Sequence, residues 1–179
     1  MYGQGRHFSS GANVDELAAR IRQQSRTDEA GTITSYPSFL MENNASFRFF
    51  DSLKIPVIAA IRGVCLGSAL ELALFCHVRL CGDGTVFALP ETTFGLVPGC
   101  GGIQKVIGRA GMAKGLEIIL GGMNFSADQA REWNIVDRVV PKKEVVDRAL
   151  FLAEKISSAY DRKDLRRYLQ EFMPEATGD

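Results

Sequence analysis

Two predicted strands flank a short predicted helix in the middle of the chain, and this order of elements constrains the fold most strongly. Residues 55–61 (IPVIAAI) form a β-branched apolar run that predicts a buried strand. Residues 67–76 (GSALELALFC) are rich in Ala and Leu and predict a buried helix. Residues 78–81 and 85–89 predict two further strands around a Gly-Asp-Gly turn. Because strand, helix and strand follow one another at this spacing, we expect parallel pairing and an α/β fold.

Helices dominate the rest of the predicted structure. The expected helices are 15–24, 38–53, 103–108, 112–120, 127–133, 144–159 and 161–172, and one more strand is expected at 135–140. Ser126 and Gln129 have the spacing of a capping box for the helix that follows. Residues 1–13 and 27–38 are expected to be loops, since turn-forming residues dominate them.

The charge balance excludes some classes of partner. The chain has 179 residues, long enough for a sizeable core in one domain, and its 21 basic residues are balanced by 21 acidic ones. Zero net charge gives no general attraction to nucleic acid or to an anionic membrane, and we expect neither partner. A local basic cluster at 162–167 is expected to be a solvated helix face.

Four cysteines are present, and none of them forms a CxxC pair. They are Cys65, Cys76, Cys81 and Cys100. With only two histidines in the chain, we expect buried, reduced thiols that behave as small hydrophobes, and no metal site. Residues 1–11 contain no apolar signal core, and no uncharged apolar run approaches the ~20 residues of a membrane span. The sequence therefore predicts a cytoplasmic protein.

Two isolated carboxylates lie in the most apolar, glycine-rich parts of the chain. Glu71 is the only acidic residue between Asp51 and Asp83, and Glu91 is the only one between Asp83 and Glu117. A carboxylate on a buried helix is costly unless it is paired or functional. Two such groups close together raise each other's pKa, which suits one acid and one base at neutral pH.

Two structural alternatives stay open for these carboxylates. Glu71 could form a salt bridge, for which Arg62, Arg79 and Arg109 are the candidate partners. Glu91 follows Pro90, and a Glu in a first helical turn is ordinary because the helix dipole favours it.

The start of the helix at 67–76 is a candidate anion site. Glu71 lies one turn after Ser68 and leans toward the end of the helix where backbone N–H groups lack partners. Such donors favour an oxyanion, so this end could form half of an oxyanion hole. The small-residue loop at 7–14 could supply the other half, although a plain helix entry capped by Asn13 or Asp15 is the more common use of such a loop.

Four stretches of the chain resemble the crotonase (enoyl-CoA hydratase/isomerase) superfamily. They are GQGRHFSSGANVDEL at 3–17, GVCLGSALELAL at 63–74, FALPETTFGLVPGCGG at 87–102 and FSADQAREWNIVDRVVP at 125–141. The resemblance implies a spiral of repeated ββα units with C-terminal helices that build trimers or hexamers. Residues 1–140 would then form the α/β core, and residues 141–179 a helical oligomerisation segment.

The resemblance also implies roles for particular residues. The backbone N–H groups of Ala12 and Ser68 match the oxyanion-hole donors, and Ser68 replaces the usual glycine. Glu71 and Glu91 match the two catalytic glutamates of the hydratases. Further substrate contacts are implied at Ser10, Gly67, Gly99 and Gly101, with Gly102 in the same glycine loop. Asn13 and His77 stand where an Asp is usual, and neither is expected to be catalytic.

The activity implied is hydration of a 2-enoyl-CoA thioester, with coenzyme A as part of the substrate and no other cofactor. Glu71 would activate the water and Glu91 would deliver a proton to the α-carbon. Isomerase, thioester hydrolase and decarboxylase activities stay open, because pocket shape decides between them and residues 27–50 are expected to line the pocket.

The alternative to an enzyme is a catalytically weak family member that serves as a subunit or binding module. The strand-helix-strand unit that usually precedes the first oxyanion loop is missing from this sequence. Its absence is expected for a catalytically weak family member. It is also expected if the sequence is a fragment, or if a partner chain completes the sheet. Both glutamates are retained, which argues for an enzyme.

Overall fold

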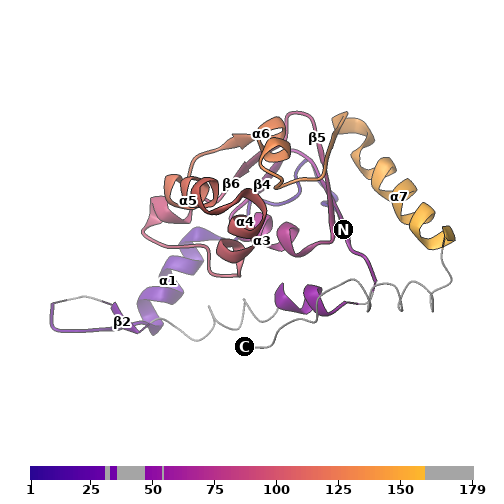
Figure 1. Cartoon of the computed structure of the whole chain (residues 1–179). Coiled ribbons are helices and arrows are strands. Elements are labelled where there is room, and N and C mark those ends of the chain that lie inside the picture. The colour runs from indigo at the N-terminus through magenta and orange to yellow at the C-terminus, as the bar shows by residue number, and fades with distance from the viewer. Residues whose placement is uncertain (31–32, 36–46, 54, 160–179) are drawn as a thin grey trace.

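The computed structural model describes residues 1–30, 33–35, 47–53 and 55–159, and its core is a pair of three-stranded sheets (Figure 1). The strands of the first sheet are β3 (Ile58–Ile61), β5 (Val78–Gly82) and β8 (Arg138–Val140), and those of the second are β4 (Val64–Leu66), β6 (Val86–Ala88) and β7 (Phe125–Ser126). β5 pairs in parallel with both β3 and β8. β4 and β6 are also parallel, whereas β7 is antiparallel to β6. The expected parallel pairing is therefore confirmed.

The chain winds so that each turn contributes one strand to each sheet. β3 is followed by β4 and then a helix, and β5 is followed by β6 before the next helices. The N-terminal segment begins the same pattern, since Tyr2 forms a parallel bridge with Ala60 of β3 and Ser9 forms one with Cys65 of β4. This is the ββα spiral expected from the sequence, although residues 1–13 had been expected to be only a loop.

The helices begin and end close to the predicted residues. They are α1 (Val14–Gln24), α3 (Ser68–Phe75), α4 (Gly102–Ala110), α5 (Met112–Gly121), α6 (Ala127–Glu132) and α7 (Val145–Ala159). Short 3-10 helices are η1 (Phe49–Ser52), η2 (Pro90–Phe94) and η3 (Lys142–Glu144). The capping box is confirmed, because the Ser126 hydroxyl accepts from the Gln129 N–H and the Gln129 side chain accepts from the Ser126 N–H. The helix expected at 161–172, the basic cluster at 162–167 and most of the helix expected at 38–53 lie outside the described residues.

Two apolar cores lie on the two sides of the first sheet. The larger one surrounds α3, which is apolar nearly all round, and includes the fully buried residues Leu70, Leu74 and Phe87. The smaller one joins β3 and β5 to α7 through residues such as Leu80 and Val145. Figure 1 accordingly shows α7 on one side of the strands and α4 and α5 on the other.

The prediction of strands differed from the structure in several places. β7 was missed because it has only two residues. β4 was missed because its three residues are too few for a periodic pattern and follow directly after Gly63. The strands expected at 78–81 and 85–89 exist, but they belong to different sheets. Residues 27–38 were expected to be a loop, whereas β1 (Arg26–Thr27) and β2 (Ile33–Ser35) form a short antiparallel pair.

A buried ion pair that the sequence did not predict fastens the end of α3 to β8. Arg79 of β5 is fully buried, and its guanidinium donates to the carboxylate of Asp137 at 2.7 Å and to the carbonyl oxygen of Ile135 at 2.9 Å. It also donates to the carbonyl oxygen of Cys76. Because each of the three guanidinium nitrogens finds an acceptor, the cation is tolerated inside the fold.

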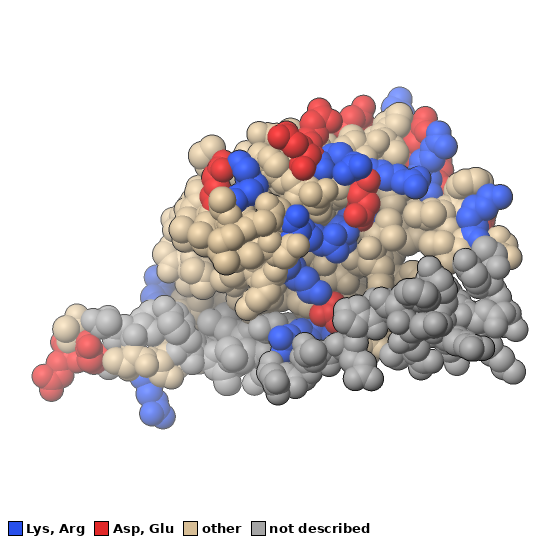
Figure 2. All heavy atoms as spheres, viewed as in Figure 1, with Lys and Arg blue, Asp and Glu red and all other residues tan. Residues whose placement is uncertain are grey.

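Surface charges and cysteines follow the expected pattern within the described residues. Acidic and basic side chains are interspersed on the face shown in Figure 2. The four cysteines are buried and free, as predicted. Among the helices that the structure describes, none has both the length and the hydropathy needed to cross a membrane.

Candidate active site

Glu71 is buried on α3 and is held by the loop that precedes α4. Only 1% of the residue is exposed, and its Oε1 atom accepts hydrogen bonds from the backbone N–H groups of Cys100 and Gly102, each at 2.8 Å. Among the described residues no arginine pairs with Glu71, and Arg79 is paired with Asp137 instead. The salt-bridge alternative for Glu71 is therefore wrong.

The glycines of the 99–102 loop make this contact possible to different degrees. Gly101 has a left-handed conformation with φ of 92° and precedes the first turn of α4. At Gly102, an added Cβ atom would lie 2.6 Å from Cγ of Glu71, so no side chain fits there. Gly99 is exposed, and the nearest atom to a Cβ added there is the carbonyl oxygen of Val97 at 3.9 Å. Gly101 and Gly102 thus shape the carboxylate site, whereas Gly99 has no comparable contact.

Glu91 lies in the first turn of η2 and faces the start of α3. A Cβ atom added to Gly67 would lie 2.9 Å from Oε1 of Glu91, so the carboxyl group lies against the backbone at Gly67. Its other oxygen, Oε2, is buried and has no hydrogen-bond partner in the described part of the chain. Buried polar atoms normally have a partner, so this atom is available to a ligand.

The environments of both carboxyl groups raise their affinity for protons. Burial is the largest cause of the raised pKa of Glu71, and the hydrogen bonds from Gly102 and Cys100 partly oppose it. Burial also raises the pKa of Glu91, to about 7, and the nearby charge of Glu71 adds to the increase. The site therefore contains one carboxylate held by N–H donors and one carboxyl group that can give up or take a proton near neutral pH.

The loop at 9–12 lies beside the first turn of α3, as an oxyanion hole requires. A Cβ atom added to Gly11 would lie 2.6 Å from the carbonyl oxygen of Leu66 and 3.5 Å from the backbone nitrogen of Ser68. The Ser9 hydroxyl accepts from the Gly11 N–H at 3.1 Å and fixes the turn. Within the described residues, the N–H groups of Ala12 and Ser68 have no acceptor. Two candidate donors thus remain available to a ligand.

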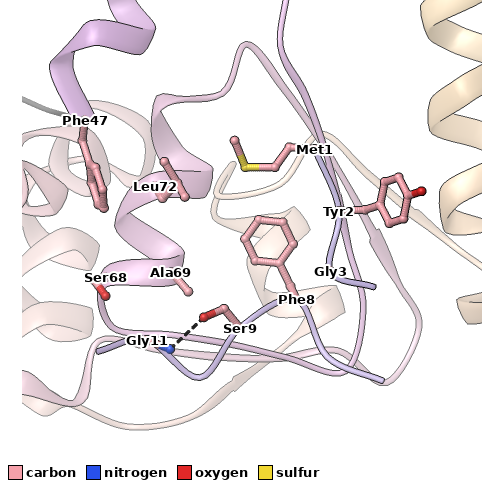
Figure 3. Close-up of a pocket in the computed structure, with 10 residues that line it drawn as sticks. All are labelled: Met1, Tyr2, Gly3, Phe8, Ser9, Gly11, Phe47, Ser68, Ala69 and Leu72. Carbon is pink, nitrogen blue, oxygen red and sulfur yellow. Dashed lines mark hydrogen bonds between the residues drawn. The ribbon is translucent and has the colours of Figure 1, made fainter. Parts of the chain in front are cut away.

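A pocket of about 220 Å³ opens on this side of α3 (Figure 3). Its lining residues are Met1, Tyr2, Gly3, Phe8, Ser9, Gly11, Phe47, Ser68, Ala69 and Leu72. The pocket reaches both Gly11 and Ser68, but Glu71 and Glu91 are not among its lining residues. The pocket thus reaches the candidate oxyanion hole, and the two glutamates lie outside its lining.

Phe47 is the one described residue of the segment 27–50 that lines this pocket. Ser10, for which a substrate contact was expected, is exposed in the neighbouring loop. That contact stays a prediction.

Three further residues near the site have structural contacts. Asn13 caps α1 by accepting from the N–H groups of Asp15 and Glu16, and His77 Nδ1 accepts from the N–H of Val57 at 3.0 Å. The sequence did not predict that the Cys100 thiol lies next to Glu71. Burial and the negative charge of Glu71 raise the pKa of this thiol to about 12, which keeps it neutral.

Comparisons with known proteins point to one family. The family model described as enoyl-CoA hydratase/isomerase matches residues 1–177. A probable mitochondrial enoyl-CoA hydratase of Dictyostelium discoideum is 33% identical over 156 residues, which is 87% of this chain and 52% of that protein. The chain thus spans about half the length of this relative.

Solved structures show the same fold. The enoyl-CoA hydratase of Bacillus anthracis has a TM-score of 0.81 at 28% identity, over 99% of this chain and 65% of that one. A putative enoyl-CoA hydratase of Thermobifida fusca YX, crystallised in complex with CoA, has a TM-score of 0.80 at 25% identity, over 99% of this chain and 68% of that one.

Proposed function

Because the chain belongs to the enoyl-CoA hydratase/isomerase family, whose members share the crotonase fold, we propose that it adds water across the double bond of a 2-enoyl-CoA thioester. The observation that carries this proposal is the pair of carboxyl groups of the buried Glu71 and the half-buried Glu91. A hydratase needs one group to take a proton from water and another to give a proton to carbon, and two carboxyl groups with raised pKa values meet both needs.

Glu71 is the better candidate for the base. Its Oε1 atom is occupied by two N–H donors, which favour the ionised form and fix the direction of the other oxygen. That second oxygen would accept a proton from water while the water oxygen bonds to the β-carbon of the enoyl group.

Glu91 is the better candidate for the acid. Its pKa of about 7 keeps a large share of the carboxyl group protonated at neutral pH, and Oε2 has no protein partner in the described residues. Glu91 would deliver its proton to the α-carbon. Glu71 would then lose the proton it took from water, and Glu91 would take up a proton, by exchange through solvent, so both groups return to their starting forms.

The thioester oxygen would bind between the N–H groups of Ala12 and Ser68. Negative charge develops on this oxygen when water attacks, and two N–H donors stabilise it. Coenzyme A would enter only as part of the substrate. We further propose a homo-trimer or hexamer built through residues 141–179, and a cytoplasmic location.

Hydration of crotonyl-CoA, followed as the loss of the absorbance of the conjugated thioester, tests the proposal. We expect turnover by the unmodified chain and a loss of about 100-fold or more in kcat for Glu71→Gln and for Glu91→Gln. Glu132→Gln, which changes an exposed carboxylate at the end of α6, is the control and should keep full activity.

An inert chain that still binds crotonyl-CoA would point to another reaction of the family. An inert chain that binds no thioester would support the alternative of a catalytically weak subunit. Sedimentation of the purified chain would show whether it forms trimers or hexamers.

A further inference from the structure

The hydroxyl of Ser68 lies at the end of the pocket where the candidate oxyanion donors are. Ser68 is the first residue of α3, and its side chain lines the pocket across from Gly11 (Figure 3). Two other lining residues carry a hydroxyl: the Ser9 hydroxyl accepts a hydrogen bond from the Gly11 N–H, and the Tyr2 side chain points away from the other lining side chains in Figure 3. Among the described residues, the Ser68 hydroxyl has no hydrogen-bond partner.

The rest of the pocket offers this hydroxyl little to bind. Most of the wall is apolar and includes the side chains of Met1, Phe8, Phe47 and Leu72, as Figure 3 shows. A ligand that fills the pocket would separate the hydroxyl from water. Because a buried hydroxyl without a partner is unfavourable, such a ligand must bring an acceptor to this end of the pocket.

The acceptor that the proposed reaction brings to this place is the thioester oxygen. The N–H of Ser68 is available at the same residue, and the Gly11 backbone lies close enough that an added Cβ would be 3.5 Å from the Ser68 nitrogen. Glu91 approaches the preceding residue, Gly67, from the other side. A carbonyl oxygen bound by the Ser68 N–H is therefore within reach of the hydroxyl of the same residue.

We infer that the Ser68 hydroxyl is a third hydrogen-bond donor to the thioester oxygen, in addition to the backbone N–H groups of Ala12 and Ser68. This inference rests on the proposed function. The hydroxyl strengthens the binding of the oxygen as it gains negative charge, so it stabilises the transition state more than the bound substrate.

Removing the hydroxyl tests the inference in turnover. We expect Ser68→Ala and Ser68→Gly to lower kcat and kcat/KM for crotonyl-CoA together, by about tenfold or more. Ser68→Thr restores a hydroxyl and should recover much of the rate. Ser158→Ala, which removes an exposed hydroxyl at the end of α7, is the matched control. If Ser68→Gly is as fast as the unmodified chain or faster, the hydroxyl is only an obstacle and the inference is wrong.

A second measurement separates this inference from the proposed function. Acetoacetyl-CoA forms an absorbing enolate when donors stabilise its thioester oxygen, and this signal requires no addition of water. At saturating acetoacetyl-CoA, we expect a weaker enolate absorbance for Ser68→Ala than for the unmodified chain. In Ser68→Thr the absorbance should recover. Equal absorbance in all variants overturns the inference. A chain that shows this difference but does not hydrate crotonyl-CoA contradicts the proposed hydration and supports the role of Ser68.

Discussion

The backbone N–H of Gly102 donates a 2.8 Å hydrogen bond to Oε1 of Glu71, at a distance that leaves no room for a side chain on residue 102. The two residues lie 31 positions apart in the chain, on α3 and on the first turn of α4. This contact joins the candidate base to the start of the next helix, so the carboxylate and the helix position each other.

Gly102→Ala should displace Glu71 and lower both stability and activity. The added Cβ would lie 2.6 Å from Cγ of Glu71, and such overpacking costs about 1–3 kcal/mol of the free energy of unfolding. Urea denaturation and the rate of crotonyl-CoA hydration would measure the two effects. Gly108→Ala is the control on the same helix, since nothing lies within 4 Å of its added Cβ, and it should stabilise by about 0.4–1 kcal/mol. Equal effects of the two substitutions would contradict the prediction.

The protonation of Glu91 should make stability depend on pH. Its pKa is about 7 in the folded chain against an ordinary value of 4.5, so the folded state binds more protons than the unfolded state between these two values. The free energy of unfolding contributed by this group therefore falls as the pH rises from 4.5 to about 7, and stays constant above. Glu91→Gln should gain stability relative to the unmodified chain across that window, as measured by urea denaturation at several pH values. Parallel curves would show that Glu91 does not titrate there.

Hydration activity should also fall on the alkaline side of this pKa. If Glu91 delivers a proton to the substrate, kcat/KM of the unmodified chain declines as the pH rises through about 7. Glu91→Gln should lose both the rate and this decline. A rate that rises through the same range would assign Glu91 the role of a base.

Asp137→Asn should destabilise the fold by about 1.5–3 kcal/mol, because it removes the charge that is hydrogen-bonded to the buried Arg79. The side chain of Asp137 is 39% exposed, so water partly compensates and the effect stays below that of a fully buried pair. Glu144→Gln breaks the exposed pair with Arg148 and should change stability by about 0.5 kcal/mol or less. Thermal or urea denaturation compares the two variants. Similar decreases in the free energy of unfolding would contradict a stabilising role for the Arg79–Asp137 pair.

Ser126→Ala should cost about 1 kcal/mol of the free energy of unfolding, because it removes the side-chain acceptor from the first turn of α6. Urea denaturation measures the loss. Ser52→Ala, which removes an exposed hydroxyl that donates to the carbonyl oxygen of Phe49, is the comparison and should cost less. Loss of helix α6 in hydrogen exchange would locate the effect.

Local patterns in the sequence predicted the local elements well. The helix stripes, the cap at Ser126 and the buried strand before Gly63 depend on neighbours within a few residues, which sequence periodicity reports directly. The isolation of Glu71 and Glu91 among apolar residues likewise predicted two carboxyl groups with raised pKa values, and the structure has Glu71 buried and Glu91 half-buried.

Contacts between distant segments could not be predicted in the same way. The partners of Glu71 are the backbone N–H groups of Cys100 and Gly102. Because nearly every residue has a backbone N–H, the residue types in the sequence do not show which ones will donate. Arg79 could equally have paired with Glu71, and only the three-dimensional arrangement selects Asp137. The placement of β4 and β6 in a second sheet depends on how the chain winds, which a three-residue strand does not encode.

The pairing of β4 with β6 determines the spacing of the two glutamates. Leu66 is paired with Ala88, and the Gly67 N–H donates to the carbonyl oxygen of Ala88 at 2.9 Å, so α3 and η2 both start from one rung. The separation of Glu71 and Glu91 therefore depends on the pairing register of β4 and β6. A slip of one residue would shift the start of α3 relative to the start of η2 by about 3.3 Å and turn the strand's side chains to the opposite face. The pairing register of two short strands thus sets the relative position of the two carboxyl groups. An insertion or deletion in either strand is therefore expected to disturb the site.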